Sequence, residues 1–271
     1  MDTTIKQYTT LAYALRRAGI GVTFLALAVT ANANINLVTN GGFETTVCTG
    51  AVSPCTNGGG GQLPSVNSGN TPGVVTATGW ANSGYAFIFT PGTGDTTGSF
   101  SSEYNLPVIL WSTTNGGADV LPATSPSGGN YLGSDPVYQQ GPLSQQINGL
   151  TPGHTYTLDF NYAGAQQTDQ QGPTMEGWQV SFGSQTQSTP TLNNVTQGFT
   201  GWKSETFNFT ADGTSDLLTF MAFGSPTGLP PFTLLDGVTL TPEPGFYVPG
   251  LGLLTVMVGL GIRRSKKSVK I

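Results

Sequence analysis

The stretch Leu150-Thr-Pro-Gly-His-Thr-Tyr-Thr-Leu-Asp-Phe-Asn-Tyr162 decides the fold of this chain. It opens with Pro152 and Gly153, which favour a tight turn. After the turn, large apolar side chains occupy every second position, at Tyr156, Leu158, Phe160 and Tyr162. Because side chains alternate between the two faces of a β-strand, this spacing predicts a strand with one buried face.

Similar short runs, rich in β-branched and aromatic residues, recur on both sides of this stretch and are separated by turn residues. Outside two membrane-type segments near the termini, no stretch shows a sustained helical period. The pattern predicts an all-β fold, an antiparallel β-sandwich of jelly-roll type. The predicted strands are Val74–Trp80, Tyr85–Thr90, Pro107–Trp111, Asn130–Ser134, Leu143–Asn148, Thr155–Ala163, Gly177–Gly183, Gly201–Thr210, Leu217–Phe223 and Phe232–Leu240.

The length and composition fit one large β domain between two special termini. Of the 271 residues, about 205 lie between those termini, enough to bury a core. The chain has 39 glycines, 18 prolines and 10% aromatic residues. Only 8% of the residues are charged, against about 25% in an average soluble domain. Asn, Gln, Thr and Ser therefore supply most of the polarity.

The charge of the central domain excludes one class of partner. Residues 34–241 contain twelve acidic residues and one basic residue, Lys203, which gives a net charge of −11. Proteins that bind nucleic acid need a basic surface for the phosphates. We therefore expect no nucleic-acid partner, and neutral ligands or divalent cations instead.

Residues 1–33 have the features of a secretory signal peptide. Arg16 and Arg17 close a positively charged region, an apolar segment follows over 19–29, and Ala31-Asn32-Ala33 is a small-x-small cleavage site. This predicts a signal-peptide helix, export through the Sec route and a mature chain that begins near Asn34. An uncleaved N-terminal anchor is the alternative.

Residues 242–271 combine a short motif, a membrane-length run and a basic tail. Pro242-Glu243-Pro244 precedes an almost uncharged apolar run over 245–262. At a helical rise of about 1.5 Å, this run reaches roughly 27 Å, close to the thickness of a bilayer's hydrocarbon core. The tail 263–271 carries Arg263, Arg264, Lys266, Lys267 and Lys270. The order predicts a C-terminal transmembrane helix with a cytoplasmic tail.

This order of parts resembles the PEP-CTERM sorting signal of Gram-negative bacteria. The resemblance implies that Pro242, Glu243, Pro244, Arg263 and Arg264 form a signal handled by an exosortase, a membrane processing enzyme. The protein would first be anchored in the inner membrane with its ectodomain in the periplasm, and would then reach the cell surface or extracellular matrix. A plain single-pass anchor with a Pro-rich stalk is the alternative.

Two motifs frame the central domain. Near the expected mature N-terminus, a predicted strand from Ile35 leads into Asn40-Gly-Gly-Phe-Glu44, and the last predicted strand is Phe232-Thr-Leu-Leu-Asp-Gly-Val-Thr-Leu240. Both resemble the ends of galactose-binding-like jelly rolls, which include many carbohydrate-binding modules. The resemblance implies one structural calcium ion held by Glu44 and Asp236. Many relatives carry two consecutive acids where this chain has Asp236 alone, so two simply hydrogen-bonded acids are the alternative.

The two cysteines, Cys48 and Cys55, lie in a loop predicted over 45–73 that is rich in Gly, Ser, Pro and Asn. In an exported chain with no further cysteine, a disulfide between them is the simple interpretation.

Sugar binding needs exposed aromatic faces next to polar side chains. Trp111 and Tyr138 are the best candidates, because polar, turn-rich stretches flank both. Trp80, Trp178 and Trp202 each follow a glycine at the edge of a predicted strand, where a large ring more often covers the core. Tyr162 is a further candidate.

Catalysis has weaker candidates. The single histidine, His154, lies in a turn, and a glycosidase would need two carboxylates on facing elements. The acids that could supply such a pair are Asp135, Asp159, Glu176 and Glu205. No recognisable motif surrounds them, so we expect a non-catalytic protein. The first functional hypothesis is a surface protein that binds extracellular polysaccharide; the second is a structural or adhesive surface protein without a sugar site; the third is an exported glycoside hydrolase.

Overall fold

The computed structural model describes residues 35–48, 60–65 and 75–243. The predicted signal peptide, the apolar run 245–262, the basic tail and Cys55 lie outside these ranges. Within the described ranges, helical structure is limited to the 3-10 helix η2, Thr113–Asn115. No helix within the described part of the chain is long and apolar enough to cross a membrane.

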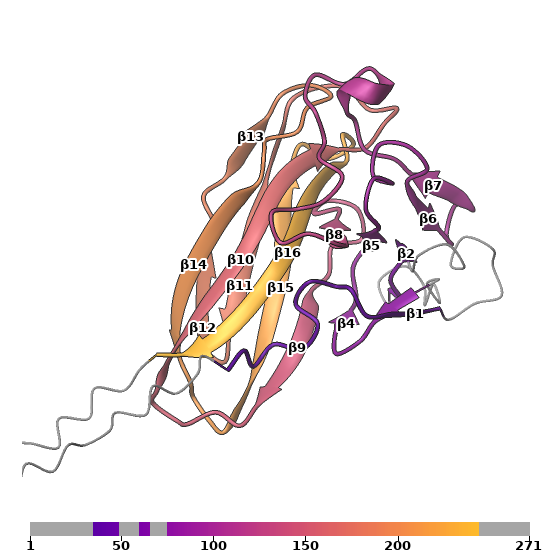
Figure 1. Cartoon of the computed structure of the whole chain (residues 1–271). Coiled ribbons are helices and arrows are strands. Elements are labelled where there is room, and N and C mark those ends of the chain that lie inside the picture. Colours follow the sequence, from indigo (N-terminus) through magenta and orange to yellow (C-terminus); the bar gives the residue numbers. More distant parts are fainter. Residues whose placement is uncertain (1–34, 49–59, 66–74, 244–271) are drawn as a thin grey trace, which may run out of the picture. The chain divides into compact units, whose positions relative to one another are not determined.

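The strands form two large antiparallel sheets (Figure 1). The first sheet has the order β14 (Lys203–Thr210), β10 (Thr155–Gln166), β16 (Pro231–Pro242), β8 (Tyr131–Ser134), β5 (Ala86–Phe89) and β2 (Gly61–Gln62). The second has the order β12 (Gln185–Ser188), β11 (Thr174–Phe182), β15 (Ser215–Ser225), β9 (Leu143–Asn148) and β4 (Ala81–Asn82), with β13 (Leu192–Asn194) also on β11.

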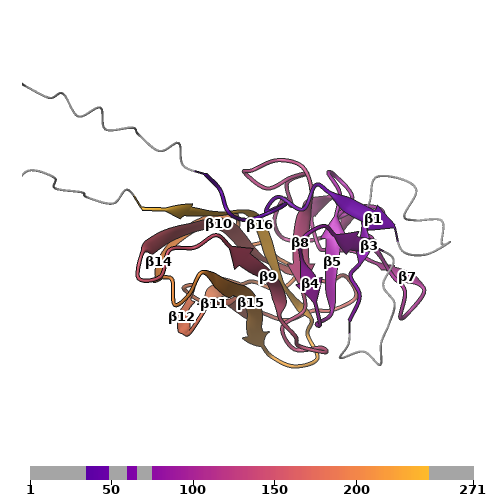
Figure 2. The same ribbon diagram turned by 90° about the horizontal axis from the view of Figure 1, so that it is seen from below.

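Two further sheets of two short strands each complete the described structure. One joins β1 (Thr46–Cys48) to β3 (Val75–Ala77), and the other joins β6 (Ser99–Ser101) to β7 (Leu106–Val108). Figure 2 shows β10, β14 and β16 in one layer and β11, β12 and β15 in the other. The predicted antiparallel β-sandwich is therefore confirmed.

The main core lies between the two sheets. The alternating side chains of β10 that the sequence marks as apolar are all buried there. Phe160 from the first sheet meets Phe220 from the second with ring centroids 5.3 Å apart, and Trp178 lies 5.9 Å from the same ring. Burial of these rings supplies the main apolar contribution to stability, since each removes a large area from water.

A second core cluster covers the outer face of the first sheet. On β5, Ala86 and Ile88 face the main core, whereas Phe87 and Phe89 belong to this outer cluster. The segment that carries Val108, Leu110 and Leu121 packs over them. Strand β5 is thus buried on both faces, which explains its continuous apolar run. The covering segment, which includes β6, β7 and η2, forms one side of the pocket described below.

The predicted first strand is wrong. Leu37 N donates to Leu240 O at 2.8 Å, but the partner of Leu240 N is the side-chain Oδ1 of Asn36. This side chain also accepts from Val38 N at 3.0 Å, which curls the chain before a regular ladder can form. The predicted loop 45–73 is also partly wrong, because its described parts include β1 and β2.

Candidate functional site

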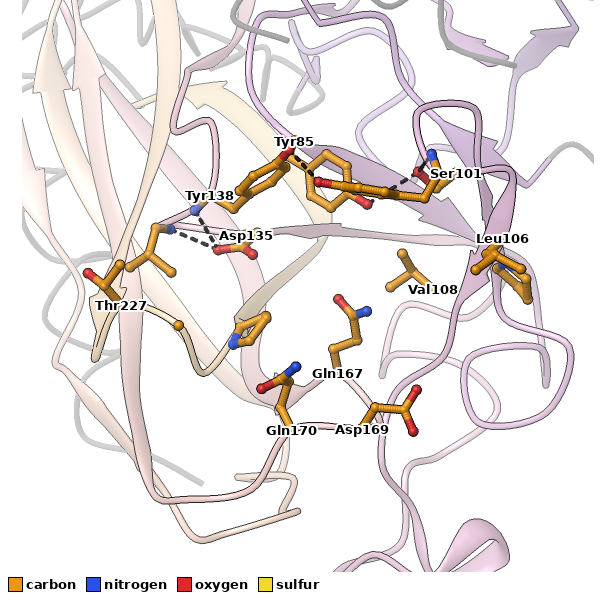
Figure 3. A pocket seen from close by; sticks show the side chains of 15 residues that line it. Tyr85, Ser101, Leu106, Val108, Asp135, Tyr138, Gln167, Asp169, Gln170 and Thr227 are labelled. Carbon is orange, nitrogen blue, oxygen red and sulfur yellow. Dashed lines mark hydrogen bonds between the residues drawn. The ribbon is translucent and has the colours of Figure 1, made fainter.

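The structure contains a pocket of about 510 Å³ beside the outer face of the first sheet (Figure 3). It lies where the β6–β7 hairpin, the turn after β8, and the segments 167–170 and 227–230 meet. Its volume is within the range of small-molecule binding sites, roughly 300–1,000 Å³. We therefore treat it as the candidate functional site.

Three tyrosines form one wall of this pocket. Tyr85 and Tyr138 meet edge to face with centroids 5.0 Å apart, and Tyr104 lies 6.2 Å from Tyr138. Tyr104 belongs to the β6–β7 turn, where Asn105 adopts a φ of 56°. It is 53% exposed, so about half of this residue is accessible from solvent. Leu106, which follows the turn, adds an exposed apolar side chain to the rim.

Hydrogen bonds fix the tyrosine hydroxyls. Tyr138 donates to Oε1 of Glu103 at 2.6 Å and accepts a very short bond from the hydroxyl of Tyr104. Gln139 Nε2 donates to the same Glu103 oxygen at 2.9 Å. Desolvation, followed by the bonded Glu103, raises the pKa of Tyr138 above its usual value. The Tyr138 hydroxyl thus keeps its proton for the bond to Glu103 and holds the hairpin to the turn after β8.

A buried glutamine anchors the hairpin from the other side. Gln62 of β2 is fully buried, and its Oε1 accepts from Ser101 Oγ at 3.0 Å and from Ser102 N at 3.0 Å. Ser101 Oγ in turn lies 3.2 Å from the hydroxyl of Tyr85. One amide oxygen thus organises the backbone that leads to Glu103 and Tyr104.

Asp135 caps the turn that presents Tyr138. Its Oδ1 accepts from Val137 N at 2.8 Å and from Tyr138 N at 3.0 Å. The side chain is buried and lines the pocket. Desolvation raises its pKa to about 6, although the two backbone bonds favour the charged form.

The wall opposite the tyrosines is polar. Gln167, Asp169 and Gln170 come from the segment after β10 and lie across the pocket from Tyr85 and Tyr138 (Figure 3). Thr168 N donates to Ile109 O at 2.8 Å, which ties this segment to the covering layer. The pocket thus combines aromatic faces with amide and carboxylate groups.

Of the two predicted sugar-binding residues, the structure brings one to the pocket. Tyr138 lines it. Trp111 is half-buried outside the lining and donates from Nε1 to the carbonyl of Gln170 at 2.9 Å, so it supports the polar wall from behind. Sequence reasoning missed Tyr85 and Tyr104. The polar turn around Tyr104 is the same signal that marked Tyr138, and it could have found this residue.

The remaining aromatic candidates pack inside the protein. Trp178 and Tyr162 are buried in the main core, and Trp80 lies at its edge with Nε1 bonded to Asn40 O at 3.0 Å. Trp202 packs against Tyr131 of the outer cluster with centroids 5.7 Å apart. The expected packing role of these tryptophans is therefore what the structure shows.

The two acids expected to hold calcium come together beside Gly42. A Cβ at Gly42 would lie 3.7 Å from Asp236 Oδ1 and 3.7 Å from Glu44 Oε1. Asp236 lies next to a register shift in the β10–β16 ladder, where Gly237 has a φ of 63°. Gly129 has a φ of 65°, which favours glycine, and a Cβ there would displace the Glu44 carboxylate.

Both acids already accept hydrogen bonds, but one buried oxygen of Asp236 does not. Glu44 Oε1 accepts from Asn130 N at 2.9 Å, and Asp236 Oδ2 accepts a very short bond from Ser125 Oγ. Asp236 Oδ1 is buried without a hydrogen-bond partner. Desolvation first, and the charge of Glu44 last, raise the pKa of Asp236 to about 7. An orphaned carboxylate oxygen beside a second carboxylate fits an oxygen-seeking cation.

The donor set around Gly42 is small, however. Within the described ranges, no group of three or more His, Cys, Asp or Glu side chains could hold a metal. A calcium ion between Glu44 and Asp236 would therefore need carbonyl oxygens or water as its other ligands.

The catalytic candidates do not converge. Asp135 lines the pocket, whereas Glu176 is fully buried between the sheets. Asp159 pairs with Thr206 and Glu205 pairs with Phe160, so the two acids point to opposite faces of the β10–β14 ladder. The exposed His154 lies in the turn before β10, with its backbone N bonded to Thr151 O at 3.1 Å.

The residues of the predicted sorting motif begin where the sandwich ends. Pro242 is the last residue of β16 and pairs with Tyr156. Glu243 N donates to Thr155 O at 3.0 Å, and its Oε1 accepts from Thr157 Oγ1 at 2.9 Å. Pro244, Arg263 and Arg264 lie outside the described residues. Cys48 ends β1, but its predicted partner Cys55 also lies outside them, so the disulfide stays a prediction.

No family model and no curated protein sequence matches this chain. Among solved structures, it is similar to TmCBM61 in complex with β-1,4-galactotriose, with 14% identity, 77% of this chain and 99% of that chain covered, and a TM-score of 0.37. The CBM22-1 xylan-binding domain from Paenibacillus barcinonensis Xyn10C matches with 13% identity and a TM-score of 0.34. The match covers 63% of this chain and 89% of that domain. The enzymatically active domain of bacteriophage CBA120 tailspike protein 4 matches with 12% identity and a TM-score of 0.34. The match covers 77% of this chain and 22% of that chain. These TM-scores are low, so the β-sandwich rests on the strand pairing itself.

Proposed function

We propose that this protein is an exported, non-catalytic surface protein of jelly-roll type that binds extracellular polysaccharide in the tyrosine-walled pocket. This proposal rests mainly on one observation: an aromatic wall and a polar wall face each other across the pocket. The aromatic wall consists of Tyr85, Tyr104 and Tyr138. The polar wall of Gln167, Asp169 and Gln170 lies across the pocket from Tyr85 and Tyr138. This combination suits a sugar ring, which has apolar faces and a polar edge of hydroxyl groups.

The pocket is also prepared for binding before a ligand arrives. Tyr138 is fixed by Glu103 and Gln139, and the hairpin that carries Tyr104 is anchored by Gln62. A site whose side chains are already ordered loses less conformational entropy on binding. The 53% exposure of Tyr104 leaves the aromatic wall open to an extended chain.

Binding assays on the full-length chain test this proposal. The chain is titrated with a panel of neutral polysaccharides and their oligosaccharides, and affinity is measured by calorimetry and by affinity gel electrophoresis. We expect binding that Tyr104→Ala and Tyr138→Ala each weaken by roughly two- to tenfold, if a ring–sugar contact contributes about as much as an aromatic pair, about 0.5–1.5 kcal/mol. Leu217→Ala removes an exposed apolar side chain from the second sheet and serves as the matched control.

The outcomes separate the functional hypotheses. Absence of binding across the panel would favour a structural or adhesive protein without a sugar site. Release of reducing ends during the assay would favour the glycoside hydrolase hypothesis instead.

The sorting part of the proposal rests on the order of motif, apolar run and basic tail over 242–271. We propose that an exosortase-type enzyme acts near Pro242-Glu243-Pro244 after Sec export. The test compares the location of the full chain with that of a variant truncated after Glu243, which keeps every strand residue of β16. Mass spectrometry of the mature C-terminus should find cleavage near the motif. An intact tail in the inner membrane would leave an ordinary anchor.

We also propose one structural calcium ion between Glu44 and Asp236. The support is the pair of carboxylates beside Gly42 and the unpartnered Oδ1 of Asp236. In that position the ion would join the N-terminal segment to β16 and offset the repulsion between the two acids.

A further inference from the structure

We infer that the tyrosine-walled pocket selects its ligand by charge and takes sugar units that carry a free amino group in preference to acidic sugars. This inference rests on the proposed function and adds the chemical class of the ligand. It follows from the charges around the pocket and from how its carboxylates are arranged.

Two carboxylates reach the pocket from different walls, and none of its described lining residues is basic. Asp135 belongs to the turn after β8, and Asp169 belongs to the segment after β10. Glu103 adds a third carboxylate behind the tyrosine hydroxyls, with its Oε2 buried and unpartnered. A ligand in the pocket thus meets negative charge on both sides.

The described protein offers little to neutralise these charges. Its basic side chains are Lys203, which lies opposite Tyr162 on the β10–β14 ladder, and His154, in the turn before β10. Neither lines the pocket. A ligand ammonium group would therefore supply a counter-charge that the described chain does not.

Asp135, Asp169 and the tyrosine rings would favour an ammonium group in different ways. Asp135 is buried, and a buried carboxylate without a cationic partner is unfavourable, so an ammonium group nearby offsets part of this cost. Asp169 is exposed at the rim, where it would attract a cationic ligand. The faces of Tyr104 and Tyr138 favour a cation as well, through the ring quadrupole. A uronate or sulfate group would instead bring a like charge toward Asp135 and Asp169.

The test compares three oligosaccharides of equal length on the full chain at pH 7: a glucosamine oligomer, its N-acetylated form and a uronic acid oligomer. We expect the amino form to bind tightest and the acidic form weakest, with about a tenfold difference between these two. Asp169→Asn should reduce the preference for the amino form over the N-acetylated form. Asp159→Asn, which changes an exposed acid outside the pocket lining, should leave the preference unchanged.

Each outcome has a distinct meaning. Equal or tighter binding of the uronic acid oligomer overturns the charge selection but leaves polysaccharide binding intact. Binding of the amino oligomer that survives Tyr104→Ala, or that falls equally in Asp159→Asn and Asp169→Asn, reveals attraction to the acidic surface as a whole and also overturns it. Absence of binding to all three, together with failure of the neutral panel, contradicts the proposed function itself.

Discussion

The hydroxyl of Tyr138 donates a hydrogen bond of 2.6 Å to Oε1 of Glu103. This contact joins the turn after β8 to the β6–β7 hairpin, two segments that are separated by 35 positions in the sequence. It fixes the angle between two rings of the pocket wall, because Tyr104 bonds to the same hydroxyl. The aromatic wall of the pocket therefore depends on a polar contact beneath it.

Replacing Tyr138 by Phe tests this contact separately from the ring. The variant keeps the aromatic face but leaves Glu103 without its closest donor. We expect a loss of about 1 kcal/mol in the free energy of unfolding and a loss of affinity smaller than that of Tyr138→Ala. Urea unfolding and calorimetry measure the two quantities. Equal affinities for the Phe and Ala variants would show that the ring face contributes nothing.

Gln62→Ala should weaken binding although Gln62 does not itself line the pocket. The variant removes the oxygen that accepts from Ser101 and Ser102, so the hairpin that carries Tyr104 loses its anchor. We expect a destabilisation of about 1–3 kcal/mol, as is usual when buried donors lose their acceptor. Gln179→Ala, at an exposed position of β11, is the matched control. Unchanged affinity in Gln62→Ala would mean that the hairpin holds its position without this anchor.

The stability of the protein should fall as pH rises, because of Glu176. Its carboxyl is fully buried, and Thr174 and Asn194 lie beside it without meeting hydrogen-bond geometry. Desolvation raises its pKa from 4.5 to about 8. The folded state thus holds this proton more tightly than the unfolded state does. Its contribution is fully present below the unfolded pKa and is lost as pH rises through the folded pKa.

Urea unfolding at pH 5 and pH 8 measures this effect. We expect the wild-type protein to be less stable at pH 8 by on the order of a few kcal/mol, and Glu176→Gln to remove much of that difference. Asp236 and Asp135 contribute in the same direction through their raised pKa values, about 7 and about 6. A pH dependence that Glu176→Gln leaves unchanged would show that this carboxyl finds a partner in solution.

Millimolar calcium should raise the melting temperature of the full chain. An ion that binds the folded state alone stabilises it in proportion to the logarithm of its concentration. The increase should be larger at pH 8 than at pH 5, since a raised pKa keeps Asp236 protonated in acid. Asp236→Asn should abolish the increase, and Asp159→Asn should retain it. A melting temperature that calcium leaves unchanged would mean that Glu44 and Asp236 are held by hydrogen bonds alone.

The long strands could be predicted from sequence because their signal is local. The prediction for β9 has the observed bounds, and alternation along β10 identified the side chains that fill the main core. Strands β2 and β4 have two residues each and exist only because a distant strand pairs with them. The predicted strand at Ile35 failed because the Asn36 side chain takes the place of a backbone partner.

The site could be predicted only in part, for a related reason. Tyr138 was identified from its polar surroundings, and Trp111 was chosen by the same rule. Whether Tyr138 or Trp111 lines the pocket depends on the packing of the covering layer. The Trp111 indole, for example, donates to a carbonyl 59 positions away. Tyr104 lies between two strands of three residues that have no clear pattern of their own.

A crystal structure of the protein with a bound oligosaccharide tests the central claim most directly. We predict a sugar ring stacked on Tyr104 or Tyr138, with its hydroxyl groups within hydrogen-bond distance of Gln167 or Asp169. A sugar bound elsewhere, for example on the outer face of the second sheet around Leu217, with the tyrosine-walled pocket empty, would contradict it.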